Sequence, residues 1–204
     1  MATGRLIPGW SEICLISCFP FPTFLIMQQV SAEELKKLYA LGQREFRSID
    51  LSHADLFNAD LRGIDLSGSN LTQIYLPYGN LSQSRLQTVQ LVEAELGDVQ
   101  LYQTDLSAAN LEGANLSRAN FHQVNLEGAN LYKSNLYKAN LYQANLRGAN
   151  LGEADLRGAN LKCANLDGAQ LGGCNFFRAQ YVDFTGAKLD AHTVLPSGYR
   201  PYFP

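Results

Sequence analysis

A large apolar residue recurs every five residues over most of this 204-residue chain. These residues run without a slip in register from Phe46 to Tyr181. Of the 25 such positions from 51 to 171, 24 are leucine and the remaining one is Phe121. The residue two places before each is small or β-branched, most often alanine, and the residue immediately before each is mostly Asn or Asp. The pattern therefore repeats in units of five.

A period of five fits neither an α-helix nor a continuous strand. Five helical residues rotate a side chain by about 140° modulo a full turn, so the leucines would spread around the whole helix. On one strand, leucines five apart would alternate between faces. They converge only if the chain turns once in every repeat and the coils stack, with each leucine and its small neighbour pointing to a central axis. The pattern therefore predicts an all-β solenoid, and the expected core includes Leu116, Leu136, Leu156, Phe121, Ala149 and Ala159.

The repeat Ala-Asn/Asp-Leu-x-x, which covers residues 46–181, resembles the pentapeptide-repeat family. The resemblance implies a right-handed, four-sided parallel β-helix with four repeats in each coil. Twenty residues per coil would give about seven coils, and the spacing of a β-ladder then implies a rod about 33 Å long. We expect the Asn and Asp side chains to bond to nearby backbone at the corners, which is a structural role rather than a catalytic one.

The two ends of the repeats need covers, because a solenoid exposes apolar core and unpaired strands there. In residues 31–45, Ser31 and Glu34 form a capping box, and Leu35 and Leu38 share one face of the helix that follows. The sequence therefore predicts an N-terminal capping helix. Residues 182–204 resume the spacing of five two residues out of phase, which indicates a C-terminal cap and tail, with a loose tail as the alternative.

Residues 1–30 do not follow the repeat. Their apolar run is interrupted by Pro20 and Pro22 and is too short to span a membrane. We interpret the segment as a disordered or mis-annotated leader, with Met27 as the true start, and we expect a cytoplasmic protein. The alternative is export to the periplasm or the thylakoid lumen, if residues 1–32 act as a signal peptide.

The charge and the motifs exclude several classes of function. A formal net charge of −3 and a pI near 5.6 argue against a nucleic-acid partner. The chain shows no phosphate loop, nucleophile elbow or metal-ligand spacing, so we expect no enzyme activity, cofactor or metal. Residues 46–110 hold 8 acidic and 3 basic side chains, whereas residues 111–181 hold 5 and 7. We expect a protein partner of unknown identity, and the sequence leaves open a monomer or an end-to-end dimer.

Stacked coils let the sequence predict which side chains are neighbours, because residues twenty apart should lie one above the other. One such line carries aromatic rings and the line beside it carries amides; the candidate interaction face consists of Tyr102, His122, Tyr142, Gln103, Gln123 and Gln143. Aromatic side chains often anchor interfaces. The alternative is that these side chains only stack as structural ladders.

By resemblance, one known activity of the family is protection of DNA gyrase from quinolones through imitation of duplex DNA. Duplex DNA carries one negative charge in each ~1.7 Å of axis, so a mimic of this length would need roughly 20 charges. The repeats have a net charge of −3. The sequence therefore favours a non-enzymatic scaffold that binds another protein, with the gyrase-directed DNA mimic as the alternative.

Overall fold

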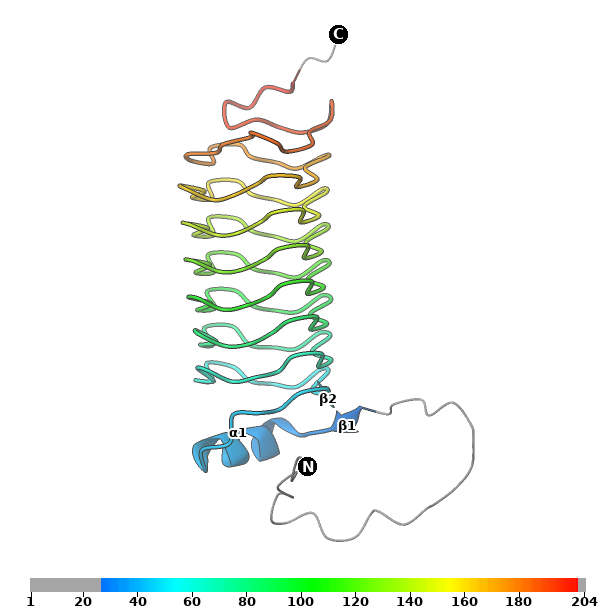
Figure 1. Cartoon of the computed structure of the whole chain (residues 1–204), viewed down its shortest axis with the longest axis vertical. Helices are drawn as coiled ribbons and strands as arrows, with labels where there is room; N and C mark the ends of the chain where they lie inside the picture. The colour runs from blue at the N-terminus through cyan, green and yellow to red at the C-terminus, as the bar shows by residue number, and fades with distance from the viewer. Residues whose placement is uncertain (1–26, 202–204) are drawn as a thin grey trace, which may run out of the picture.

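The computed structural model describes residues 27–201, so the predictions about residues 1–26 lie outside the described part of the chain. The chain winds into a stack of coils, and a single helix lies across the N-terminal end of the stack (Figure 1). This helix, α1, comprises Ala32–Ala40. Strands β1, Gln28–Gln29, and β2, Ile49–Asp50, form a short parallel pair beside it.

The coils are joined by parallel bridges between residues twenty apart, from Glu45 with Asp65 to Asn160 with Gln180. At each bridge, backbone N–H groups of both coils donate hydrogen bonds to carbonyl groups of the other coil. The Leu51 N–H donates to the Asn70 carbonyl at 2.8 Å, and the Asn70 N–H donates to the Ile49 carbonyl at 2.9 Å. These ladders stack each coil on the next, which confirms the predicted β-solenoid.

Each five-residue unit also contains a tight turn. In the unit after Asp50, the Ala54 N–H donates to the Leu51 carbonyl at 3.1 Å. His53 adopts a left-handed conformation with φ of 60°, and the same conformation recurs at the equivalent place in the other units. The Asp50 carboxylate accepts the Ser52 N–H at 2.9 Å. Where Asn or Asp precedes the leucine, its side chain therefore satisfies the one amide of the turn that the backbone ladder does not reach.

The inward positions form one continuous core from Val30 to Ala179. The six residues expected in the core are at most 1% exposed: Leu116, Leu136, Leu156, Phe121, Ala149 and Ala159. Because a leucine and an alanine two residues apart point to the same side of an extended segment, both line the axis. The small side chain leaves room for the leucine, and together they exclude water from the centre of the rod.

Helix α1 closes the N-terminal end. The Ser31 hydroxyl accepts the Glu34 N–H at 3.1 Å, and the helix gives way to Gly42, whose φ is 95°. Leu35 is fully buried and Leu38 packs partly buried against the core. The apolar stripe of the helix therefore covers the first coil, as the capping box and its spacing indicate.

At the other end, the prediction that Tyr181 continues the inward series is wrong. Tyr181 is 67% exposed, and the chain is shortened here, because the next bridges join residues 18 and 19 apart, Gln170 with Lys188 and Asn175 with Val194. Phe184 takes the place against the core and packs edge-on to Phe176, with ring centroids 5.2 Å apart. Residues 184–194 thus continue the ladder over the last full coil.

Candidate interaction surfaces

The surface of the rod is made of columns, in which residues twenty apart in sequence lie one above the other. The two residues after each leucine point outward and are free of the demands of the core. We call Tyr102, His122 and Tyr142 the histidine column. The column beside it, Gln83, Gln103, Gln123 and Gln143, is the glutamine column. The structure thus brings together the side chains that the sequence singled out.

The rings of the histidine column stack along the rod. The His122 ring lies 5.1 Å from the Tyr102 ring and 5.0 Å from the Tyr142 ring between centroids, each at an interplanar angle of 48°. All three side chains are half-buried. The His122 and Tyr142 amides are held by Asn120 and Asn140 at 3.2 and 3.3 Å. The His122 and Tyr142 rings are therefore carried on capped turns, and all three rings stand at a fixed spacing.

The glutamine column is exposed, and its amides bond to one another. The Gln103 Nε2 donates to the Gln123 Oε1 at 3.0 Å, and the Gln123 Nε2 donates to the Gln143 Oε1 at 3.0 Å. These residues occupy left-handed turn positions, with φ of 54–60° from Gln83 to Gln143. Each amide keeps a second N–H and a second lone pair for a partner. The contacts are compatible with both a binding surface and a structural ladder.

A second group of aromatic side chains, which the sequence analysis did not single out, lies on another side of the rod. The rings of Phe57, Tyr75 and Tyr78, which we call the aromatic cluster, are 51%, 45% and 55% exposed. The Phe57 ring stacks on Tyr75 at 6.2 Å and meets the edge of Tyr78 at 6.0 Å. The signal that could have revealed it is Tyr75, which occupies a position otherwise held by polar or charged residues.

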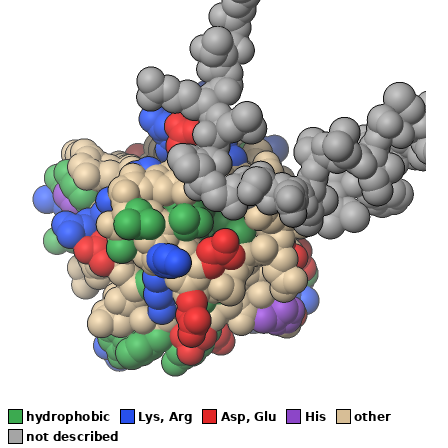
Figure 2. Space-filling model, turned by 90° about the horizontal axis from the view of Figure 1, so that it is seen from below, with side chains coloured by type: hydrophobic (Ala, Val, Ile, Leu, Met, Phe, Trp, Pro, Cys, Tyr) green, Lys and Arg blue, Asp and Glu red, His purple; other side chains and the backbone are tan. Residues whose placement is uncertain are grey.

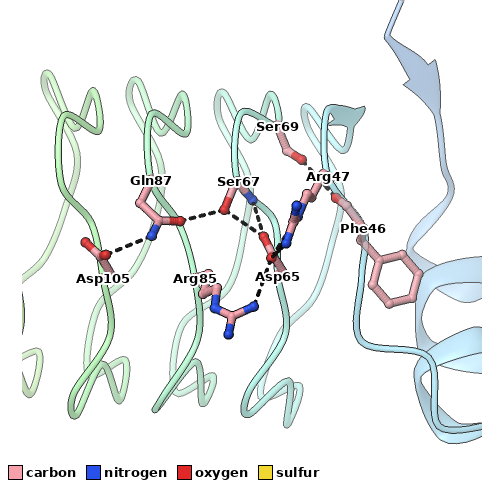
Figure 3. A network of polar contacts seen from close by, with 8 residues as sticks. All are labelled: Phe46, Arg47, Asp65, Ser67, Ser69, Arg85, Gln87 and Asp105. Carbon is pink, nitrogen blue, oxygen red and sulfur yellow. Dashed lines mark hydrogen bonds and ion pairs between the residues drawn. The ribbon is translucent and has the colours of Figure 1, made fainter. Parts of the chain in front are cut away.

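Ion pairs neutralise many of the acidic side chains on the rod. Asp65 is the most buried carboxylate, and the Arg47 Nη2 lies 2.8 Å from its Oδ2, with Arg85 on the other side at 3.6 Å (Figure 3). Burial raises the pKa of Asp65, but hydrogen bonds from Ser67 and Arg47 outweigh it, so the pKa is lowered overall. The Gln87 Nε2, which donates to Asp105 at 2.8 Å, extends the network to the next coil.

Viewed from the capped end, acidic, basic and apolar side chains are mixed around the rim of the rod (Figure 2). Seven carboxylates of the repeats form ion pairs with Arg or Lys: Asp60, Asp65, Asp98, Glu127, Glu153, Asp155 and Asp167. Because opposite charges lie so close together, the rod presents no extended surface of one sign on these columns.

The described residues offer little that resembles a catalytic centre. Within residues 27–201, no three His, Cys, Asp or Glu side chains gather as metal ligands, and no helix there is long and apolar enough to span a membrane. A hollow of about 430 Å³ near the C-terminal end includes Gly172, Asp190 and Arg200 in its lining. The Asp190 carboxylate in this hollow is already engaged, because it accepts the amides of Gly173 and Thr193 at 3.0 and 2.9 Å.

A repeating turn every five residues, a leucine-filled axis and outward columns define a solenoid repeat protein. The family model for pentapeptide repeats matches residues 41–73, 104–141 and 139–176, with 8 copies of the repeat. The chain belongs to the pentapeptide-repeat family, and its solenoid is accordingly a right-handed β-helix. No functionally curated protein matches the sequence.

Three solved structures show what the chain is similar to. HetL, a pentapeptide-repeat protein involved in heterocyst differentiation regulation in the cyanobacterium Nostoc sp. strain PCC 7120, is 30% identical; the match covers 84% of this chain and 100% of HetL, with a TM-score of 0.46. Rfr23 from the cyanobacterium Cyanothece 51142 is 27% identical, with coverage of 79% and 98% and a TM-score of 0.44. QnrB1, a plasmid-mediated fluoroquinolone resistance protein, is 21% identical, with coverage of 74% and 79% and a TM-score of 0.51. The likeness to QnrB1 concerns the fold alone.

Proposed function

We propose that the chain is a non-enzymatic scaffold that binds a protein partner along the outward columns of a four-sided rod of about seven coils. Bridges between residues twenty apart, together with a turn in every five residues, support the four sides. The observation that carries the binding proposal is the histidine column. Its stacked rings stand at a fixed spacing beside a column of exposed amides. On this side of the rod, the outward positions 82, 83, 102, 103, 122, 123, 142 and 143 carry no Asp, Glu, Lys or Arg.

The packing of the core and the geometry of the turns do not require aromatic rings in this column. The equivalent outward position carries serine at Ser107, glycine at Gly152 and arginine at Arg157, and the turns and ladders there have the same geometry. The coil therefore tolerates any side chain at this place. Rings of Tyr and His offer a large contact area with few rotatable bonds, and the adjacent amides add hydrogen bonds, which is the composition of an interface anchor.

The proposal is tested by affinity capture with the intact protein and with the triple variant Tyr102→Ala/His122→Ala/Tyr142→Ala. The matched control is Tyr132→Ala/Tyr137→Ala, which removes tyrosines from other columns. We expect a partner that binds the unaltered protein and the control but is lost with the triple variant, while the circular-dichroism spectra of all three proteins agree. A partner retained equally by the triple variant would show that these rings serve only as a structural ladder.

The second candidate function is the DNA-mimic modulator of DNA gyrase. The excess of acidic residues in 46–110 and the fold shared with QnrB1 favour it. Against it stands the pairing of carboxylates with Arg and Lys, which removes much of the charge that a DNA mimic presents. A gyrase supercoiling assay with and without a quinolone separates the two. Inhibition or protection at low micromolar protein would favour the mimic, and no effect would favour the scaffold.

A further inference from the structure

The aromatic cluster departs from the repeat in a way that the rod itself does not require. Two of its three residues, Tyr75 and Tyr78, belong to the unit Ile74-Tyr75-Leu76-Pro77-Tyr78. The place of Tyr75 is the one where Asn or Asp elsewhere accepts the amide two residues on, as Asn80 accepts the Ser82 N–H at 3.0 Å. Tyrosine has no such acceptor close to the backbone. Here, however, the residue two places on is Pro77, which has no N–H to satisfy.

The chain also departs from the repeat at the residue after this unit, Gly79. Tyr78 itself has the left-handed conformation common to this place in the repeat, with φ of 59°. Gly79 stands where the other units have a residue with a Cβ, most often alanine, and a Cβ there would meet the Leu76 Cδ1 at 2.3 Å. Tyrosine, proline and glycine thus replace the usual residues together. Together with Phe57 from an ordinary unit, Tyr75 and Tyr78 make three exposed rings that contribute nothing to the axis of the rod.

The charges around the cluster indicate what it could bind. Tyr75 lies between two carboxylates in its own column, because it bridges to Asp55 on one side and to Glu95 on the other. Asp55 accepts the Phe57 N–H at 2.9 Å and Glu95 accepts an Asn115 N–H at 2.8 Å. Among residues 27–201 neither carboxylate forms an ion pair with Lys or Arg. Two unpaired acids therefore flank the exposed rings.

Electron-rich rings flanked by carboxylates form an environment that suits a cation. A guanidinium stacks on a tyrosine face and can also donate paired hydrogen bonds to a carboxylate. Arg118, which stands in the same column as Tyr78, is already engaged, because it pairs with Asp98. We propose that the aromatic cluster binds an arginine side chain on a basic segment of a partner protein, with the ring of Tyr75 under the guanidinium and Asp55 and Glu95 at its edges. This site is separate from the histidine column.

The test uses the full-length protein and a peptide labelled at its N-terminus, fluorescein-Gly-Arg-Gly-Arg-Gly-amide, in an anisotropy titration at low salt. The comparison peptide carries citrulline in place of both arginines, which keeps the shape and removes the charge. We expect the arginine peptide to bind about tenfold more tightly than the citrulline peptide, since cation–π and charge-assisted contacts are both lost in the latter. Equal binding of the two peptides would overturn the proposal.

Two variants locate the site. Tyr75→Ala/Tyr78→Ala should weaken binding of the arginine peptide about tenfold, while Tyr102→Ala/Tyr142→Ala should leave it unchanged, because those rings lie on another side. Unchanged binding after the first pair of substitutions would mean that the acidic half of the rod attracts arginine without the rings, which overturns the proposal.

A repeat-restoring variant, Tyr75→Asn/Pro77→Ser/Tyr78→Gly, guards against loss of fold. It returns the turn to the pattern of its neighbours, so we expect a melting temperature no lower than that of the unaltered protein, with peptide binding lost. A large fall in melting temperature would show that the cluster is structural, and retained peptide binding would show that it is not the site. Because the peptide assay does not use the histidine column, its failure would leave the scaffold proposal unaffected.

Discussion

Removal of the Asn130 side chain should reveal how much each corner amide contributes to the rod. Its Oδ1 accepts the Tyr132 N–H at 3.2 Å and an Asn150 N–H at 3.0 Å. Its Nδ2 donates to the Asn110 Oδ1 at 3.0 Å and lies 3.3 Å from a Glu112 oxygen. Asn130→Ala therefore removes the cap of one turn amide and two links of the asparagine ladder.

The expected loss follows from the exposure of these groups. The side chain is half-buried, so water replaces part of what is lost. Loss of a polar cap on a backbone amide typically costs about 1 kcal/mol. The two ladder links, between half-buried amides, add about 0.5 kcal/mol each. The total is about 2 kcal/mol, which for a chain of this length corresponds to a fall in melting temperature of about 4–8 °C.

The matched control is Gln100→Ala, at the equivalent place in another unit. Gln100 accepts an Asn120 N–H at 3.0 Å and donates to the Asp98 carbonyl at 3.3 Å, so its removal breaks a ladder link without uncapping a turn amide. We expect about half the destabilisation in thermal melts followed by circular dichroism. Repeat rods can open in parts, so amide exchange at Tyr132 should accelerate in the first variant. Equal losses in the two variants would refute the capping argument.

Three further predictions concern the core, the C-terminal cap and the cysteines. Ala149→Leu should overpack the fully buried axis and lower the unfolding free energy by about 1–3 kcal/mol or more in a denaturant titration, and a neutral effect would contradict the tight packing. The pKa of Asp190 is lowered to about 2, chiefly by the hydrogen bond from the Gly173 N–H. The ionised carboxylate therefore contributes its full stabilisation above the ordinary carboxyl pKa, and this stabilisation is lost as the pH falls through about 2. Asp190→Asn should remove this acid sensitivity from the NMR signal of the Gly173 amide. Burial raises the pKa of the Cys174 thiol to about 12, so iodoacetamide at pH 8 should modify the exposed Cys163 and spare Cys174 until the protein unfolds, as peptide mapping would show.

The inward half of the structure could be predicted because the core imposes the same demand on every coil. A leucine and a small residue two places apart must share the axis wherever the chain turns each fifth residue, so Leu116 and Ala149 were assigned from spacing alone. The stacking of Tyr102 on His122 followed from the same period. The helix that begins after Ser31 was predictable from a local signal, its capping box, because that contact spans only three residues.

The other features depend on contacts between residues that are not twenty apart, which the repeat alone does not predict. Phe57, Tyr75 and Tyr78 stand at three different positions of their units, so their contacts cross between columns and require the actual geometry of the turn. The shift in phase after Tyr181 was visible in the sequence. Its consequence, bridges 18 and 19 residues apart with Phe184 turned toward the core, depends on how a shortened corner closes.

The division of roles within each unit indicates where function can reside in this rod. The small residue, the polar residue and the leucine of each five are committed to packing, capping and the core. Selection for binding can therefore act freely only on the two outward residues, or at the polar position if the turn is adjusted to match. The histidine column is a case of the first kind, in which the unit keeps its other residues. The aromatic cluster is a case of the second kind, because Tyr75 stands at the polar position and Pro77, two residues on, has no amide that needs capping. A tyrosine at a position that is otherwise always polar, accompanied by a matching change in the turn, is stronger evidence for a binding role than an aromatic residue at a position that tolerates any side chain.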